Sequence, residues 1–160
     1  LNFAAIHKLP ALFIMENNSL AIHSPIEKRQ ATDRICDRVN TYGIPTHRIE
    51  GNDVFEIYKN SKTAIKSLRQ GKGPVFLECM TYRWREHVGP EEDYDQNYRT
   101  REELEYWQKK DQMTRLAEMI ELEEKDKIDN QIDDEIREAV LFAEDSEFPT
   151  IEELEKHVFA

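Results

Sequence analysis

Short apolar runs alternate with longer stretches of helical period over the first half of the chain. Residues 11–15 form a continuous apolar run between Pro10 and Glu16, which is typical of a strand buried on both faces of a sheet. Residues 46–50 and 74–82 are the other strand candidates. Because helical patterns lie between these runs, we predict an α/β fold with a parallel sheet flanked by helices.

The predicted helices have recognisable start and stop residues. One helix begins after Thr32 or Asp33, either of which can accept hydrogen bonds from the first helical amides, and it stops at Gly43. The next helix begins at Asp53 in the spacing of a capping box and ends at Gly71. These boundaries leave two strand–helix–strand connections in the predicted sheet.

The pattern changes after the third predicted strand. Residues 83–97 are rich in charge and have no helical period, and a connection of this length is typically functional or disordered. Thr100 then opens a helix in the spacing of a capping box. A long amphipathic helix follows, with apolar residues at Ile128, Ile132, Ile136, Val140 and Ala143. We therefore predict that residues 1–100 belong to the α/β domain and that residues 101–160 form a helical C-terminal extension of the same domain.

Charge and composition limit the classes of partner. The 160-residue chain has a formal net charge of −11, so binding to nucleic acid or to a membrane is not expected. Cys36 and Cys79 lack the spacing of a metal or redox motif, which predicts reduced thiols in a cytoplasmic protein. Because the chain has no initiator Met and begins inside a helical pattern, we expect that the domain is truncated before Leu1.

The first candidate for chemistry is the Asn17-Asn18 pair, which directly follows the first predicted strand. Ligands of parallel α/β proteins bind beyond the carboxyl ends of the strands. The side-chain oxygen of Asn18 and the backbone carbonyl two residues later, at Leu20, are suitable ligands for Mg²⁺. An Asn pair on its own is more often a turn, so both interpretations stay open at this point.

The second candidate is the segment that leaves the third predicted strand, which should reach the same edge of the sheet. Arg83 and Arg85 are suited to binding phosphate oxygens, and His87 to a phosphate contact or a proton transfer. The competing interpretation is a solvated, charged loop. Tyr98-Arg99, at the far end of this loop, is interpreted as structural: an aromatic anchor before the helix cap at Thr100.

Taken together, the motifs resemble those of one family along nearly the whole chain. This family comprises the alpha subunits of the thiamine-diphosphate-dependent 2-oxo acid dehydrogenases, with the acetoin dehydrogenases as close relatives. The resemblance rests on the order of Asn2-Phe3-Ala4-Ala5, Leu9-Pro10, Glu16-Asn17-Asn18, Tyr42-Gly43-Ile44-Pro45, Gly51-Asn52-Asp53-Val54, Gly71-Lys72-Gly73-Pro74, Thr81-Tyr82-Arg83, His87 and Tyr98-Arg99.

The resemblance implies a thiamine-diphosphate-binding fold with thiamine diphosphate and Mg²⁺ as cofactors. Asn18 is then expected to bind Mg²⁺ through its side chain, and Leu20 through its backbone carbonyl. Arg83 and His87 are expected to contact the diphosphate, with His87 as the catalytic residue. The family's Gly-Asp-Gly motif, which supplies a further metal ligand, is expected upstream of Leu1.

The resemblance also implies partners and a reaction. A beta subunit completes the active site in a heterotetramer, and a lipoyl acyltransferase component receives the acyl group formed by oxidative decarboxylation. Pyruvate, branched 2-oxo acids and acetoin are all candidate substrates. The alternatives are a non-catalytic binding or assembly module of the same fold, or another thiamine-diphosphate enzyme such as a decarboxylase or a transketolase-like protein. The isolated fragment is expected to be inactive.

Two positions depart from the family pattern. Val88 stands where the mitochondrial pyruvate enzymes have a regulatory serine, so phosphorylation at this position is not expected. Arg85-Glu86 replaces the His-Gly often found before the loop histidine, which leaves the substrate open. Because residues 85–97 are charged and have few apolar anchors, we also predict that this segment is poorly ordered without cofactor.

Overall fold

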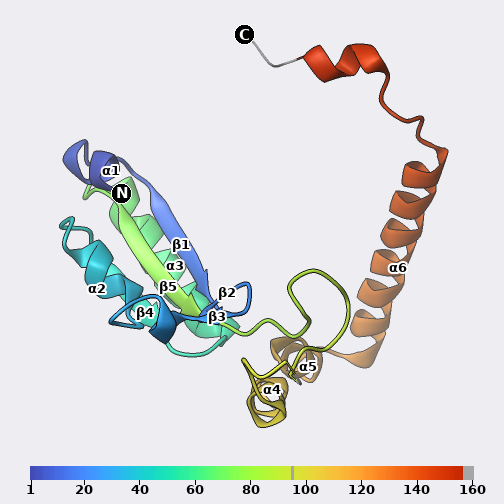
Figure 1. The fold of residues 1–160 in the computed structure, drawn as a ribbon, viewed down its shortest axis with the longest axis horizontal. Coiled ribbons are helices and arrows are strands. Elements are labelled where there is room, and N and C mark those ends of the chain that lie inside the picture. The colour runs from blue at the N-terminus through green and yellow to red at the C-terminus, as the bar shows by residue number, and fades with distance from the viewer. Residues whose placement is uncertain (95, 157–160) are drawn as a thin grey trace. The chain divides into compact units, whose positions relative to one another are not determined.

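The three predicted strands form a parallel sheet in the computed structural model of the chain, which describes residues 1–94 and 96–156 (Figure 1). The strands are β1 (Leu12–Asn17), β4 (Thr46–Ile49) and β5 (Val75–Met80), in the order β1-β5-β4. The central strand, β5, is buried along nearly its whole length. The predicted α/β fold with a parallel sheet is confirmed.

Helices cover both faces of this sheet because side chains alternate between the faces of each strand. Val75, Leu77 and Cys79 of β5 pack in one cluster with Ala64 and Leu68 of α3 (Val54–Arg69). On the other face, the core is formed by α1 (Asn2–Ile6), α2 (Ile35–Asn40) and residues of β1 and β5; its members are Ala5, Ile35, Cys36, Val39, Ile44, Phe13, Met15 and Phe76. Glu78 lies on β5 in register with Met15 of β1.

Two of the predicted helix caps are present. The Asp53 carboxylate accepts hydrogen bonds from the amides of Phe55 (2.9 Å) and Glu56 (3.3 Å) at the start of α3. The Thr100 hydroxyl accepts one from Glu103 (3.2 Å) at the start of α4 (Arg101–Gln108). Both interactions join residues two or three positions apart, which explains why the sequence pattern predicts them.

The predicted cap of α2 is wrong. The residue that precedes this helix is Arg34, and the Thr32 hydroxyl accepts a hydrogen bond from the amide of Arg34 (3.1 Å) instead of one from the helix. The first amides of α2 donate to the carboxylate of Glu78, which lies on the central strand. The cap therefore comes from a residue far away in the sequence.

A short hairpin follows β1, in the segment between the first predicted strand and the helix predicted after Thr32 or Asp33. Its strands are β2 (Leu20–Ala21) and β3 (Ser24–Pro25), and a 3₁₀ turn over Ile26–Lys28 follows. Ile26 is almost fully buried and its amide donates to the Ser19 carbonyl (2.8 Å). This hydrogen bond closes the base of the hairpin.

The rest of the chain is helical, with α4, α5 (Gln112–Ala117), α6 (Leu122–Asp145) and a 3₁₀ turn over Ile151–Glu155. The chain divides into two compact units, Leu1–Arg115 and Leu116–Ala160. The expected division of the domain after residue 100 stays a prediction, and the last four residues of the predicted extension lie outside the described residues.

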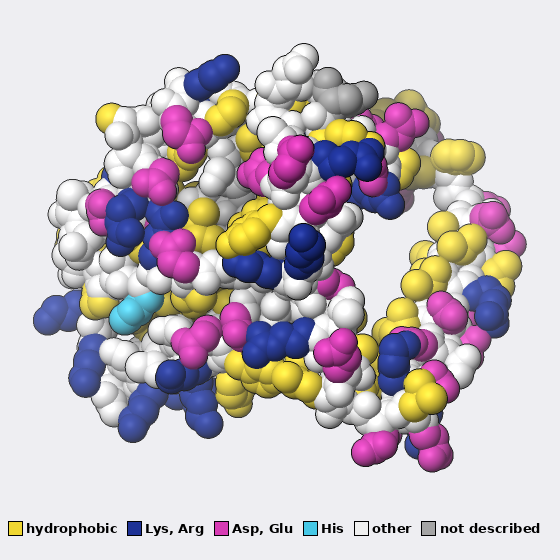
Figure 2. Space-filling model, turned by 90° about the horizontal axis from the view of Figure 1, so that it is seen from below, with side chains coloured by type: hydrophobic (Ala, Val, Ile, Leu, Met, Phe, Trp, Pro, Cys, Tyr) yellow, Lys and Arg dark blue, Asp and Glu magenta, His cyan; other side chains and the backbone are white. Residues whose placement is uncertain are grey.

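Helix α6 has the amphipathic pattern that the sequence predicts. Figure 2 shows hydrophobic side chains along one side of this helix and charged ones along the other. Ile128, Ile132, Ile136 and Val140 of this stripe are each exposed by 46 to 56%. Of the helices in the described part of the chain, none has the length and apolarity that a membrane crossing requires.

Candidate functional site

The two candidate segments leave the sheet side by side, from the carboxyl ends of adjacent strands (Figure 1). Asn17, the last residue of β1, is in register with Met80, the last residue of β5. The amide of Thr81 donates to the Asn17 carbonyl (3.0 Å), which extends the pairing into the loop. The parallel arrangement therefore places the segments after residues 17 and 80 at one edge of the sheet, as the sequence pattern predicts.

Both polar atoms of the Asn17 side chain form hydrogen bonds within the protein. It is only 3% exposed, and its Nδ2 donates to Oε1 of Glu78 at 2.7 Å. Its Oδ1 accepts a hydrogen bond from the amide of Ser19 at 2.9 Å. This side chain is therefore a structural part of the turn, and the neighbouring Asn18 is the residue with an oxygen to offer.

Asn18 lies in a second, overlapping turn of the same kind. Its Oδ1 accepts a hydrogen bond from the amide of Leu20 at 3.0 Å, and Ser19 between them has a positive φ of 62°. An amide oxygen has two lone pairs, so Oδ1 can accept this bond and still bind a cation. The amide of Ile26 donates to the Ser19 carbonyl, so Leu20 and Pro25 form a non-hydrogen-bonded pair and the Leu20 carbonyl points away from the partner strand. The turn thus contains two neutral oxygen atoms that can bind a cation.

Neutral oxygen ligands are relevant here because carboxylate and imidazole side chains form no metal-binding cluster in the described part of the chain. Among residues 1–94 and 96–156, no three His, Cys, Asp or Glu side chains are close enough together to hold a metal ion. Mg²⁺ prefers six oxygen ligands and usually keeps water and phosphate oxygens among them. The Asn18–Leu20 turn therefore fits the ion as a partial site that a phosphate group and a further ligand would complete.

Glu78 is fully buried behind this turn. It accepts hydrogen bonds from Asn17 Nδ2 and from the amides of Ile35 (3.4 Å) and Cys36 (2.9 Å). Burial acts to raise the pKa of Glu78, but these hydrogen bonds outweigh it and hold the pKa below its usual value. The group is therefore a carboxylate in spite of its burial.

The two cysteines are free and buried. Burial, followed by the nearby Glu78 carboxylate, raises the pKa of the Cys36 thiol to about 11. Burial also raises the pKa of Cys79. Both side chains are consequently protonated thiols at neutral pH, which makes them poor nucleophiles and poor metal ligands.

Arg83 connects the loop after β5 with the hairpin after β1. Its guanidinium donates to the carbonyl of Ile22 (3.4 Å), to the Tyr98 hydroxyl (2.9 Å) and to the Asp93 carboxylate (3.1 Å). Its Nε is buried and has no acceptor among the described residues. The structure therefore brings Arg83 against the hairpin that begins at Leu20.

Two residues hold this loop together: Arg99, which the sequence pattern indicated as structural, and Asp93, which it did not single out. Asp93 is 0% exposed and Arg99 is 5% exposed, and they form an ion pair. Arg99 also donates to the backbone carbonyls of Arg83 and of Arg85 (3.2 Å). Asp93 is thus shared between two arginines that lie sixteen residues apart. The available signal for Asp93 was that it is an acidic residue in a loop with an arginine near each end.

His87 has a different environment. Its side chain is exposed, and it forms no hydrogen bond or ion pair with any residue of the described ranges. The amide of Glu86 donates to the Glu91 carbonyl (2.9 Å), which closes the tip of the loop around His87 and the 86% exposed Val88. The structure places Arg83 against Ile22 of the hairpin that follows Asn18 and Leu20, and it leaves His87 without a partner among the described residues in the same loop as Arg83. The predicted disorder of residues 85–97 without cofactor stays a prediction, and Asp95 of that segment lies outside the described residues.

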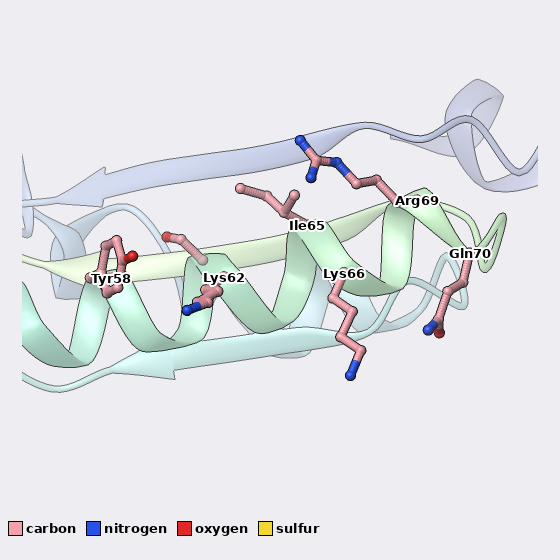
Figure 3. Close-up of a pocket in the computed structure, with 7 residues that line it drawn as sticks. Tyr58, Lys62, Ile65, Lys66, Arg69 and Gln70 are labelled. Carbon is pink, nitrogen blue, oxygen red and sulfur yellow. The ribbon is translucent and has the colours of Figure 1, made fainter.

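A separate hollow lies along α3. Figure 3 shows its lining, which comes from Tyr58, Lys62, Ile65, Lys66, Arg69 and Gln70 on that helix. None of the predicted site residues lines this hollow. The candidate site is therefore the edge of the sheet beside the hairpin.

Comparisons with known proteins agree on one family. The family described as "Dehydrogenase E1 component" matches residues 1–152. The alpha subunit of 2-oxoisovalerate dehydrogenase from Bacillus subtilis is 44% identical over 110 residues, which cover 69% of this chain and 33% of that protein. The alpha subunit of acetoin:2,6-dichlorophenolindophenol oxidoreductase from the same organism is 35% identical over 165 residues, which cover 99% of this chain and 48% of that protein.

A third relative belongs to another organism. The pyruvate dehydrogenase E1 component subunit alpha of Staphylococcus aureus is 36% identical over 121 residues, which cover 76% of this chain and 32% of that protein. This chain therefore spans about a third to a half of the length of these relatives.

Proposed function

This chain belongs to the dehydrogenase E1 component family, and on that premise we propose that it is part of the alpha subunit of a thiamine-diphosphate-dependent 2-oxo acid or acetoin dehydrogenase. Its contribution is to bind Mg²⁺ and the diphosphate group of the cofactor. The observation that supports this most directly is the tight turn from Asn18 to Leu20 beside Arg83, at the carboxyl end of a parallel sheet.

The residues of the turn have separate roles in this proposal. Asn18 binds Mg²⁺ through Oδ1 and Leu20 through its carbonyl, both as neutral oxygens. Arg83, whose side chain is 18% exposed, donates from its guanidinium to a diphosphate oxygen. A doubly charged ion and an arginine together offset the charge of the diphosphate in a chain whose net charge is −11.

His87 is the proposed catalytic residue of this chain. Its side chain has no partner within the described residues, so both ring nitrogens are available to donate to a phosphate or to move a proton. When bound, thiamine diphosphate supplies the chemistry that stabilises the negative charge formed on decarboxylation of a 2-oxo acid. The protein positions that group and controls protons around it.

The partners follow from the same proposal. A beta subunit completes the active site in a heterotetramer, and a lipoyl acyltransferase component accepts the acyl group. The names of the relatives, which are alpha subunits, support a partner subunit of this kind. The substrate is a 2-oxo acid or acetoin.

Isothermal titration calorimetry of the full-length alpha subunit with its beta subunit tests the proposal. We expect thiamine diphosphate to bind only in the presence of Mg²⁺, and Asn18→Ala to weaken this binding by roughly 100-fold, which is the upper range for the loss of a group that controls a metal site. Asn40→Ala, at the exposed end of α2, is the control and should bind as the natural protein does. Unchanged binding in Asn18→Ala would rule out the assigned metal ligand.

A further inference from the structure

Glu78 is a fully buried carboxylate that has no part in the proposed site contacts. It lies on the central strand, where its neighbours Leu77 and Cys79 are apolar core residues. Burying an ionised carboxylate is costly unless its oxygens are hydrogen-bonded, and an apolar side chain at such a position is often equally stabilising. The question is therefore what the hydrogen bonds of the Glu78 carboxylate do at this position.

One of these bonds controls the orientation of Asn17. A side-chain amide has a donor end and an acceptor end, and the 2.7 Å bond to Glu78 fixes Nδ2 as the end that faces the core. Oδ1 then faces the chain that follows β1, where it accepts the amide of Ser19 at 2.9 Å. Glu78 therefore determines which atom of Asn17 starts the turn.

The two turns that follow each other from Asn17 to Leu20 include both proposed metal ligands. The amide of Leu20 donates to Oδ1 of Asn18 directly after the Asn17–Ser19 bond, so the two turns share Asn18 and Ser19. A change in the orientation of Asn17 would release Ser19, whose positive φ of 62° is unfavourable for a residue other than glycine. The position of the Asn18 and Leu20 oxygens thus depends on the Asn17 amide.

Glu78 is itself held from two other sides. The amides of Ile35 and Cys36 donate to it from the first turn of α2. Arg48 of β4 lies 3.9 Å from Oε1 of Glu78 and also pairs with Glu50 at 2.7 Å. Groups of α2 and β4 consequently fix the position of the Glu78 carboxylate. The carboxylate in turn fixes the Asn17 amide at the end of β1.

We propose that Glu78 is a positioning residue for the magnesium and diphosphate site, acting through the amide of Asn17 on the Asn18–Leu20 turn. The inference rests on the proposed function of that turn. Its consequence is a specific effect on cofactor affinity, separate from any effect on the stability of the fold, because the carboxylate touches neither the metal nor the diphosphate.

The test is calorimetric titration of the full-length alpha subunit and its beta subunit with thiamine diphosphate at saturating Mg²⁺. In Glu78→Gln, one oxygen becomes an NH₂ group that cannot accept the hydrogen bond from Asn17 or from the amide of Cys36. We expect roughly tenfold weaker binding or more, as for other residues that orient metal ligands. If this variant does not assemble, Asn17→Ala removes the same bond from its other side and should weaken binding to a similar extent.

A reciprocal exchange provides the specific control. In the double variant Asn17→Asp with Glu78→Gln, the glutamine NH₂ donates to the aspartate while its oxygen still accepts the amide of Cys36, so the bond is restored in the opposite direction. We expect most of the lost affinity to return. A merely structural residue would not show this recovery.

Leu77→Ala serves as the matched control for stability, since Leu77 is 0% exposed and lies next to Glu78 on the same strand. It should lower the melting temperature of the cofactor-free protein and leave the dissociation constant nearly unchanged. Natural affinity in a folded Glu78→Gln or Asn17→Ala variant, absence of recovery in the double variant, or an equal loss of affinity in Leu77→Ala would each overturn the inference. Failure of the natural protein to bind thiamine diphosphate would instead refute the proposed function.

Discussion

Asp93→Ala is expected to lower the free energy of unfolding of the alpha subunit by about 3–5 kcal/mol, because it leaves the charges of two arginines without their buried partner. Arg99 is 5% exposed and pairs with Asp93, and the Arg83 side chain, which is 18% exposed, lies 3.1 Å from the same carboxylate. No other residue of the described ranges pairs with either arginine by an ion pair. The loss therefore comes from two uncompensated cations as well as from the missing contacts.

Urea denaturation measures this effect, and hydrogen exchange over residues 83–99 locates it. The matched control is Glu92→Ala, which also removes a loop carboxylate. Glu92 is exposed and lies 4.0 Å from Arg85, so its removal should cost less than about 1 kcal/mol. Equal stability of the two variants would show that Asp93 does not hold the loop.

The same variant bears on the site as well as on the fold. Arg83 reaches the Ile22 carbonyl of the hairpin while Asp93 holds its other end. Once Asp93 is absent, the guanidinium is free to leave the hairpin. We therefore expect the hydrogen exchange of residues 20–25 to increase together with that of the loop.

His87→Ala is expected to lower the kcat of the assembled enzyme by roughly 100-fold or more, which is the usual loss when a general acid or base is removed. Its effect on stability should be negligible, since the side chain is exposed and bonded to no described residue. Affinity for thiamine diphosphate should change much less than kcat, because the Asn18–Leu20 turn and Arg83 remain in place. A lipoamide-linked acyl-transfer assay and calorimetry on the same preparation measure the two effects.

His47→Ala is the control for this experiment, as His47 is an exposed histidine on β4 at a distance from the loop. Its turnover should match that of the natural enzyme. If His87→Ala retains natural turnover, His87 is not catalytic; if it loses cofactor binding to the same extent as turnover, its role is to bind the diphosphate.

The sequence by itself determined the elements whose causes are local. The positions of the strands were predicted from local patterns, but the burial of the first one was not. The run at residues 11–15 was predicted to be buried on both faces, whereas β1 lies at the edge of the sheet and its Ile14 is 57% exposed. The caps at Asp53 and Thr100 involve amides two or three residues away. The order of short motifs was also sufficient to identify the family, which the comparisons show.

Tertiary structure alone decided the interactions between residues that are distant in the sequence. No local pattern indicates that Glu78 caps α2, since Glu78 is 42 and 43 positions away from the two helix residues whose amides it accepts. The strand order β1-β5-β4 depends on which faces pack together, and the two-residue strands of the hairpin are too short to show a period.

The charged residues show the same division most clearly. In the sequence, Asp93 has the appearance of a residue in a solvated loop, and Glu78 interrupts an apolar strand without an evident reason. Only the folded chain brings them to partners that make their burial tolerable, because a buried charge is stable where hydrogen bonds and opposite charges surround it. The sequence determined the Asn17-Asn18 turn and the arginine beside it, whereas the buried carboxylates that hold both in position became visible only in the structure.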